Sequence, residues 1–164
     1  MIDEDVKTVQ RGVPATIMVE RHYAHPVHRV FRAWSDPLQF GRWCAPGGDW
    51  VMADSQVDFR IHGRQMMFFG PPGAPRFKGD GRFEDIVEDQ RIVTAGTMHD
   101  MDEPVGRQRM STTICMVEFI AEKGGTRLIL TDHSVFYTWE TPDDRKQGWG
   151  EILGKLDTFL KGKV

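Results

Sequence analysis

The chain has 164 residues, of which 40% are hydrophobic and 27% charged, and its formal net charge is −3. This length and composition suit one globular domain, and the near balance of acids and bases argues against a nucleic-acid-binding surface. No apolar run approaches the roughly eighteen residues of a membrane-spanning helix, and the acidic N-terminus does not resemble a secretion signal. We therefore expect a cytoplasmic protein without membrane insertion, whose two cysteines stay reduced.

The N-terminal part is expected to contain one strand and two short helices. Residues 1–14 form a loose lead-in, and residues 15–23 alternate between apolar and polar side chains, which predicts a strand. Apolar residues then recur at helical spacing over 27–34, which predicts a short helix. Asp36 and Pro37 suit the N-cap and first position of a second short helix.

The middle of the chain changes from a helical period to a period of two, which predicts antiparallel strands joined by short turns. One expected hairpin pairs 50–53 with 57–61, with Val57, Phe59 and Ile61 facing inward. The inward face of 64–69 stays undetermined. The other expected strands are 64–70, 80–87, 91–98, 107–122 and 126–136.

The chain ends in a long amphipathic helix over 141–161. Thr141 suits its N-cap, Pro142 its first position, and Asp144 its first turn. The apolar stripe of this helix consists of Trp149, Ile152, Leu153, Leu156, Phe159 and Leu160. Because such a sheet must cover its apolar face, the sequence predicts an α+β fold with about six to seven strands packed against this helix.

Several local phrases resemble one known superfamily. They are VFRAWSDPLQFGRW at 30–43, GRFEDIV at 81–87, GTRLILT at 125–131 and GWGEIL at 148–153. They are similar to the START-like (SRPBCC) superfamily, and more narrowly to the bacterial homologues of the activator of heat-shock-protein ATPase. The resemblance runs over 16–161, implies the helix-grip fold, and favours one domain over 15–164.

The resemblance also implies a cavity between the sheet and the last helix that binds a small hydrophobic or aromatic ligand. Thr94 and Gly96 stand where the family usually carries aromatics, so inward positions there would leave space. A solid core explains the same apolar residues, and both readings stay open. The expected cavity residues are Trp34, Trp43, Phe59, Ile61, Phe83, Thr94, Gly96, Phe119, Leu130, Asp132, Trp149 and Leu153.

Two alternative functions accompany this hypothesis. An enzyme of the polyketide cyclase or hydrolase kind would use Asp132 or His133 as acid or base. Adjacent strand residues point to opposite faces, however, and Asp132 would more simply be a rim carboxylate that lies in water or pairs with an arginine such as Arg60 or Arg82. Nucleophile motifs are absent, so binding without catalysis is favoured. The family also suggests a module that contacts a chaperone ATPase.

No cofactor or metal is expected. His22, His25 and His28 recur every third residue, but they span a strand and a helix start and do not converge. The acidic stretch at 99–103 lacks the spaced ligands of a calcium loop. A homodimer is left open.

Overall fold

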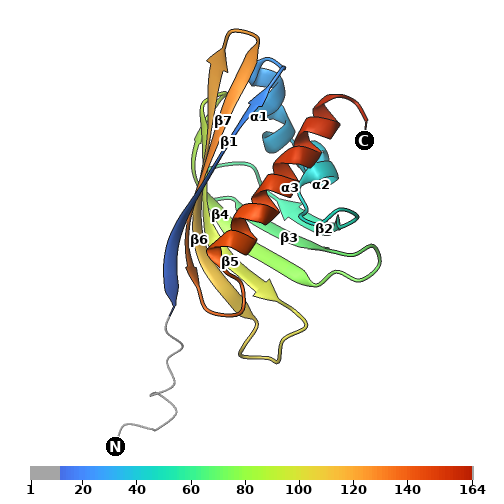
Figure 1. Ribbon diagram of the computed structural model, residues 1–164, viewed down its shortest axis with the longest axis vertical. Helices are drawn as coiled ribbons and strands as arrows, with labels where there is room; N and C mark the ends of the chain where they lie inside the picture. Colours follow the sequence, from blue (N-terminus) through green and yellow to red (C-terminus); the bar gives the residue numbers. More distant parts are fainter. Residues whose placement is uncertain (1–11, 164) are drawn as a thin grey trace, which may run out of the picture.

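The computed structural model describes residues 12–163 and shows one curved antiparallel sheet with a long helix across its concave face (Figure 1). The seven strands follow the order β1-β7-β6-β5-β4-β3-β2. They are β1 (Val13–Tyr23), β2 (Val51–Val57), β3 (Arg64–Gly70), β4 (Phe77–Val87), β5 (Arg91–Asp100), β6 (Arg109–Glu122) and β7 (Gly125–Phe136). The helices are α1 (Val27–Ser35), α2 (Pro37–Trp43) and α3 (Pro142–Leu160). The predicted α+β helix-grip fold is confirmed.

Side-chain caps start two of the helices, as the sequence predicts. The Asp36 carboxylate accepts a hydrogen bond from the backbone N–H of Leu38 at 3.0 Å, at the start of α2. At the start of α3, the Asp144 N–H donates to the Thr141 hydroxyl at 3.2 Å, and the Thr141 N–H donates to the Asp144 carboxylate at 2.9 Å. This reciprocal capping box satisfies donors that the first helical turn leaves free.

The hairpin expected within 50–61 is wrong. β2 runs through this region as one strand, and a local turn then leads to β3. In that turn the Arg60 N–H donates to the carbonyl of Asp58 at 2.8 Å, and His62 takes a positive φ of 67°. Ile61 is 48% exposed, so its expected inward position is also wrong. The apolar alternation continues into a turn that combines local backbone bonds with bonds that join His62 and Gly63 to Phe83 of β4.

The two halves of α3 differ in what they bury. All five buried apolar side chains of this helix lie in its second half, at Ile152, Leu153, Leu156, Phe159 and Leu160. Burying each of them is worth about 1.5–3 kcal/mol. The Tyr23 hydroxyl also donates to the Leu153 carbonyl at 2.8 Å, which ties β1 to this half. The second half of α3 therefore completes a solid core.

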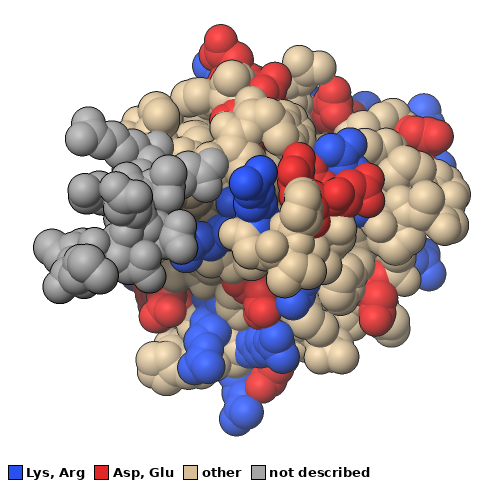
Figure 2. Space-filling model, turned by 90° about the horizontal axis from the view of Figure 1, so that it is seen from below, with Lys and Arg blue, Asp and Glu red and all other residues tan. Residues whose placement is uncertain are grey.

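The buried residues form two groups. The main cluster lies under the second half of α3, and a smaller one consists of Ala45, Phe69, Phe77 and Met110. Met67 packs against both clusters. The inward face of β3 is thus Met67 and Phe69, which answers the question left open by the sequence. Seen from below, acidic and basic side chains lie interspersed on the surface (Figure 2).

Candidate ligand cavity

Two adjoining chambers lie between the sheet and the first half of α3. The outer chamber has a volume of about 450 Å³ and the inner one about 120 Å³. Their shared lining residues are Cys44, Met67, Met98, Arg145 and Trp149. The long C-terminal helix therefore fills a core with one half and covers a cavity with the other.

Small residues on β4 and β5 make room for the inner chamber. Thr94 pairs with Cys115 across the sheet, and Gly96 pairs with Gly81. A Cβ atom on Gly96 would lie 2.6 Å from the Gly81 Cα and still closer to the carbonyl oxygen of Asp80. The close approach of β4 and β5 thus requires glycine at this position, and no larger side chain fits there.

Aromatic and methionine side chains line the outer chamber. They are Trp50, Phe69, Phe77, Met98, Met110 and Trp139. The Phe77 ring lies 5.3 Å from the Trp50 ring and 6.2 Å from the Trp139 ring, centroid to centroid. Trp139 is 51% exposed and marks the opening of the chamber. Such walls suit a flat apolar molecule.

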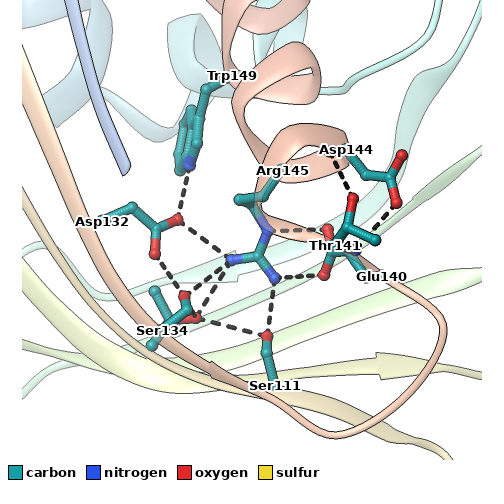
Figure 3. A network of polar contacts seen from close by, with 9 residues as sticks. Ser111, Asp132, Ser134, Glu140, Thr141, Asp144, Arg145 and Trp149 are labelled. Carbon is teal, nitrogen blue, oxygen red and sulfur yellow. Dashed lines mark hydrogen bonds and ion pairs between the residues drawn. The ribbon is translucent and has the colours of Figure 1, made fainter. Parts of the chain in front are cut away.

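A buried arginine joins α3 to the polar part of the sheet, and we call its contacts the Arg145 network (Figure 3). Its guanidinium donates to the Glu140 carboxylate at 2.9 and 2.7 Å and to Asp132 at 3.1 Å. Its remaining acceptors are the hydroxyls of Ser111, Thr113 and Ser134. These acceptors occupy all five N–H groups of an arginine. Burial opposes its charge, but the bonds to Glu140 and the attraction of both carboxylates outweigh burial and raise the pKa of Arg145.

Asp132 lies at the centre of this network and is fully buried. Besides Arg145, it accepts hydrogen bonds from the Trp149 indole N–H at 2.8 Å and from the Ser134 hydroxyl at 2.5 Å. Figure 3 shows the Trp149 ring pointing its nitrogen at this carboxylate. The arginine partner is therefore Arg145, and the expected pairing with Arg60 or Arg82 is wrong.

The remaining candidate chemical groups are one histidine and two cysteines. His133 is exposed on the other face of the sheet, with its Nδ1 2.9 Å from the Thr16 hydroxyl oxygen. Cys44 and Cys115 are buried, and burial raises the pKa of both thiols, which keeps them neutral.

The structure divides the expected cavity residues into separate groups. Trp34, Phe83, Thr94, Gly96 and Trp149 line the inner chamber. Asp132 lies behind its wall, bonded to Trp149 and Arg145. The others belong to the solid core or its edge, except the exposed Ile61: they are Trp43, Phe59, Phe119, Leu130 and Leu153.

Sequence reasoning missed the outer chamber and Arg145. A signal for Arg145 exists, because it lies four residues before Trp149 and so extends the apolar stripe of α3 by one turn. A charged residue on a buried stripe indicates an internal ion pair. Within residues 12–163, no three histidine, cysteine or acidic side chains are grouped to hold a metal, and no helix is long and apolar enough to cross a membrane.

A curved antiparallel sheet that holds a C-terminal helix over a cavity defines the helix-grip, START-like class of proteins. The family model described as "Activator of Hsp90 ATPase homolog 1-like protein" matches residues 24–161, and the chain belongs to this family. No match is found among curated proteins.

Solved structures of similar proteins agree with this assignment. An uncharacterised protein from Rhizobium leguminosarum is 33% identical, with a TM-score of 0.82 over 94% of this chain and 99% of its own. A Rhizobium loti protein is 31% identical, with a TM-score of 0.76 over 90% and 97%. An AHSA1-like protein from Aeromonas hydrophila is 25% identical, with a TM-score of 0.73 over 90% and 93%.

Proposed function

We propose that this protein binds a small apolar or aromatic molecule between the sheet and the first half of α3. The observation that carries the proposal is the outer chamber of about 450 Å³, lined by aromatic rings and methionines. Small-molecule sites commonly have volumes of about 300–1,000 Å³ with mostly apolar walls and a few polar groups. The chamber has this size and this chemistry.

The inner chamber adds to the affinity that such a site can reach. Filling a cavity of 120 Å³ with apolar groups is worth up to about 3 kcal/mol, at about 24 cal/mol per Å³. A ligand ring that reaches this chamber would gain part of that energy. The cavity is built into the fold, because Gly96 is required by the backbone of β4.

The geometry favours binding over catalysis. Asp132 is buried and already holds three hydrogen-bond donors, so it is not positioned to exchange a proton with a ligand in the chamber. His133 lies on the opposite face of the sheet. A chaperone-ATPase partner, which the family name suggests, is the alternative. Nine large apolar side chains are exposed within residues 12–163, and the two most exposed, Leu38 and Val105, lie on separate elements, α2 and the loop after β5.

Two glycines of α3 offer a matched test. A Cβ on Gly148, which lines the outer chamber, would contact Pro46 at 3.7 Å, whereas a Cβ on Gly150 would meet nothing within 4 Å. Gly148→Leu should therefore obstruct the chamber, while Gly150→Leu makes the same change outside it. We expect a neutral fluorescent dye such as phenylnaphthylamine to bind saturably and to quench tryptophan emission.

The expected effect of Gly148→Leu is a loss of affinity of about tenfold or more, which equals about 1.4 kcal/mol. The Gly150→Leu variant should bind like the unmodified protein. Non-saturable quenching, or equal binding by both variants, would contradict the proposed site.

A further inference from the structure

We infer that the cavity selects a neutral aromatic molecule with a hydroxyl or carbonyl group at its inner end, and that it rejects carboxylates and phosphates. This inference rests on the proposed function and names the class of ligand. It follows from the charges around the outer chamber and from the uncommitted polar groups in the inner one.

Acidic groups outnumber basic ones around the outer chamber. The two arginines that line it are Arg76 and Arg145. Three carboxylates line it directly, and two more, fully buried, bind these arginines: the five are Glu140, Asp144, Glu151, Asp100 and Asp132. A ligand anion would lose its hydration beside an excess of negative charge, which is unfavourable in a partly buried site.

Arg145 offers no free N–H group to an anion, and Arg76 already uses its Nε–H and an Nη2 N–H on one carboxylate. Carboxylates and hydroxyls take all the donors of Arg145. Arg76 donates to both oxygens of Asp100, at 3.0 and 2.7 Å, and lies 3.4 Å from Asp102. Bidentate recognition of a carboxylate or phosphate needs two parallel N–H groups of one guanidinium. All such pairs of Arg145 are taken by protein acceptors, and the Nε/Nη2 pair of Arg76 is taken by Asp100.

The carboxylates are likewise engaged, so a cation gains no free partner. Glu140 and Asp132 bind Arg145, as described above. Asp144 belongs to the capping box of α3, and Glu151 accepts from the Gly47 N–H at 2.6 Å. A neutral ligand disturbs none of these bonds.

Two neutral polar side chains of the inner chamber remain uncommitted. Gln65 is paired with Gly81 on β4, and Thr94 is paired with Cys115 on β6; both residues line the chamber. No side-chain hydrogen bond within residues 12–163 engages the Gln65 amide or the Thr94 hydroxyl. Each group can both donate and accept. They therefore suit a hydroxyl or carbonyl oxygen at the inner end of a ligand.

The volume of the inner chamber limits what reaches these groups. Its 120 Å³ is close to the cavity of about 150 Å³ that accepts benzene in an engineered protein. One aromatic ring with its polar substituent therefore fits the inner chamber, and the rest of the molecule lies in the outer one.

Three probes with the same ring system separate charge from hydrogen bonding. Naphthol is neutral and polar, naphthoate is an anion at neutral pH, and naphthalene has no polar group. We expect naphthol to bind at least about tenfold more tightly than naphthoate, because the carboxylate is desolvated without a partner. Naphthol should also bind about threefold to tenfold more tightly than naphthalene, because one hydrogen bond contributes about that much.

The Thr94→Val variant tests the Thr94 hydroxyl of the inner chamber, since it removes this hydroxyl and keeps the shape of the side chain. It should reduce the advantage of naphthol over naphthalene and leave naphthalene binding unchanged. Thr112→Val, on the exposed face of β6, is the matched control. Saturable binding of naphthoate as tight as that of naphthol would overturn this inference and leave the proposed function intact. Non-saturable binding of all three probes would overturn both.

Discussion

Replacing Arg145 by methionine should cost far more stability than removing a surface charge. The Arg145 side chain is 10% exposed, and its partner Asp132 is 0% exposed. Methionine keeps much of the length of the side chain but leaves Asp132 with only the Trp149 and Ser134 donors, and Glu140 without its ion pair. Breaking a buried ion pair by removing one partner costs about 3–5 kcal/mol. We expect the free energy of unfolding to fall by that amount.

Urea unfolding followed by circular dichroism measures this change. Lys146→Met is the matched control, because it removes a positive charge from the exposed adjacent position of α3 and should change stability by less than about 0.5 kcal/mol. Combining Arg145→Met with Asp132→Asn should restore part of the loss, since the unpaired carboxylate is then gone. If Arg145→Met cost no more than Lys146→Met, the network would not stabilise α3, and this reasoning would fail.

Four further substitutions have calculable signs. The hydrogen bonds from Arg76 lower the pKa of Asp100, so this pair stabilises the fold above about pH 4. The contribution is lost as the pH falls through the lowered pKa. In the Asp100→Asn variant, the urea concentration at the unfolding midpoint should therefore depend less on pH in that acid range. Gly96→Ala should destabilise by about 1–3 kcal/mol through its backbone collision, whereas Gly150→Ala in α3 should stabilise by about 0.5–1 kcal/mol in the same thermal unfolding assay. His62→Gly should stabilise by up to about 1 kcal/mol, because His62 holds a positive φ of 67°, and an unchanged or lower Tm would contradict this.

Local signals of the sequence were sufficient for most of the architecture. The caps at Asp36 and Thr141 and the apolar stripe of α3 depend on neighbours within one or two helical turns, so they can be read without the fold. Antiparallel pairing of neighbouring strands was also predicted from the short turns, whereas the pairing of β1 with β7 was not. The family resemblance then supplied the position of the helix on the concave face.

The cavity depends on contacts between distant segments, which a single sequence does not display. Trp50, Phe77 and Trp139 meet at the outer chamber from three separate parts of the chain. At Ile61 the local pattern itself misled the prediction. Its alternation with polar residues resembles a strand, but the chain turns at His62, which has a positive φ. The missing side chain at Gly96 indicated space in the sequence. The structure shows that glycine is needed there because the backbone of β4 lies too close for a Cβ atom.

Because the two halves of α3 are separate, substitutions that alter the chamber need not alter the packing of the core. Its second half is held by apolar packing, in which a substitution disturbs many neighbours at once. Its first half faces the chamber, and Gln147, Gly148 and Glu151 there line open space. Substitutions at these three positions can reshape the chamber while the packed half keeps the fold. The proposed ligand preference of this chain can therefore change through substitutions within two helical turns, with little loss of folded protein.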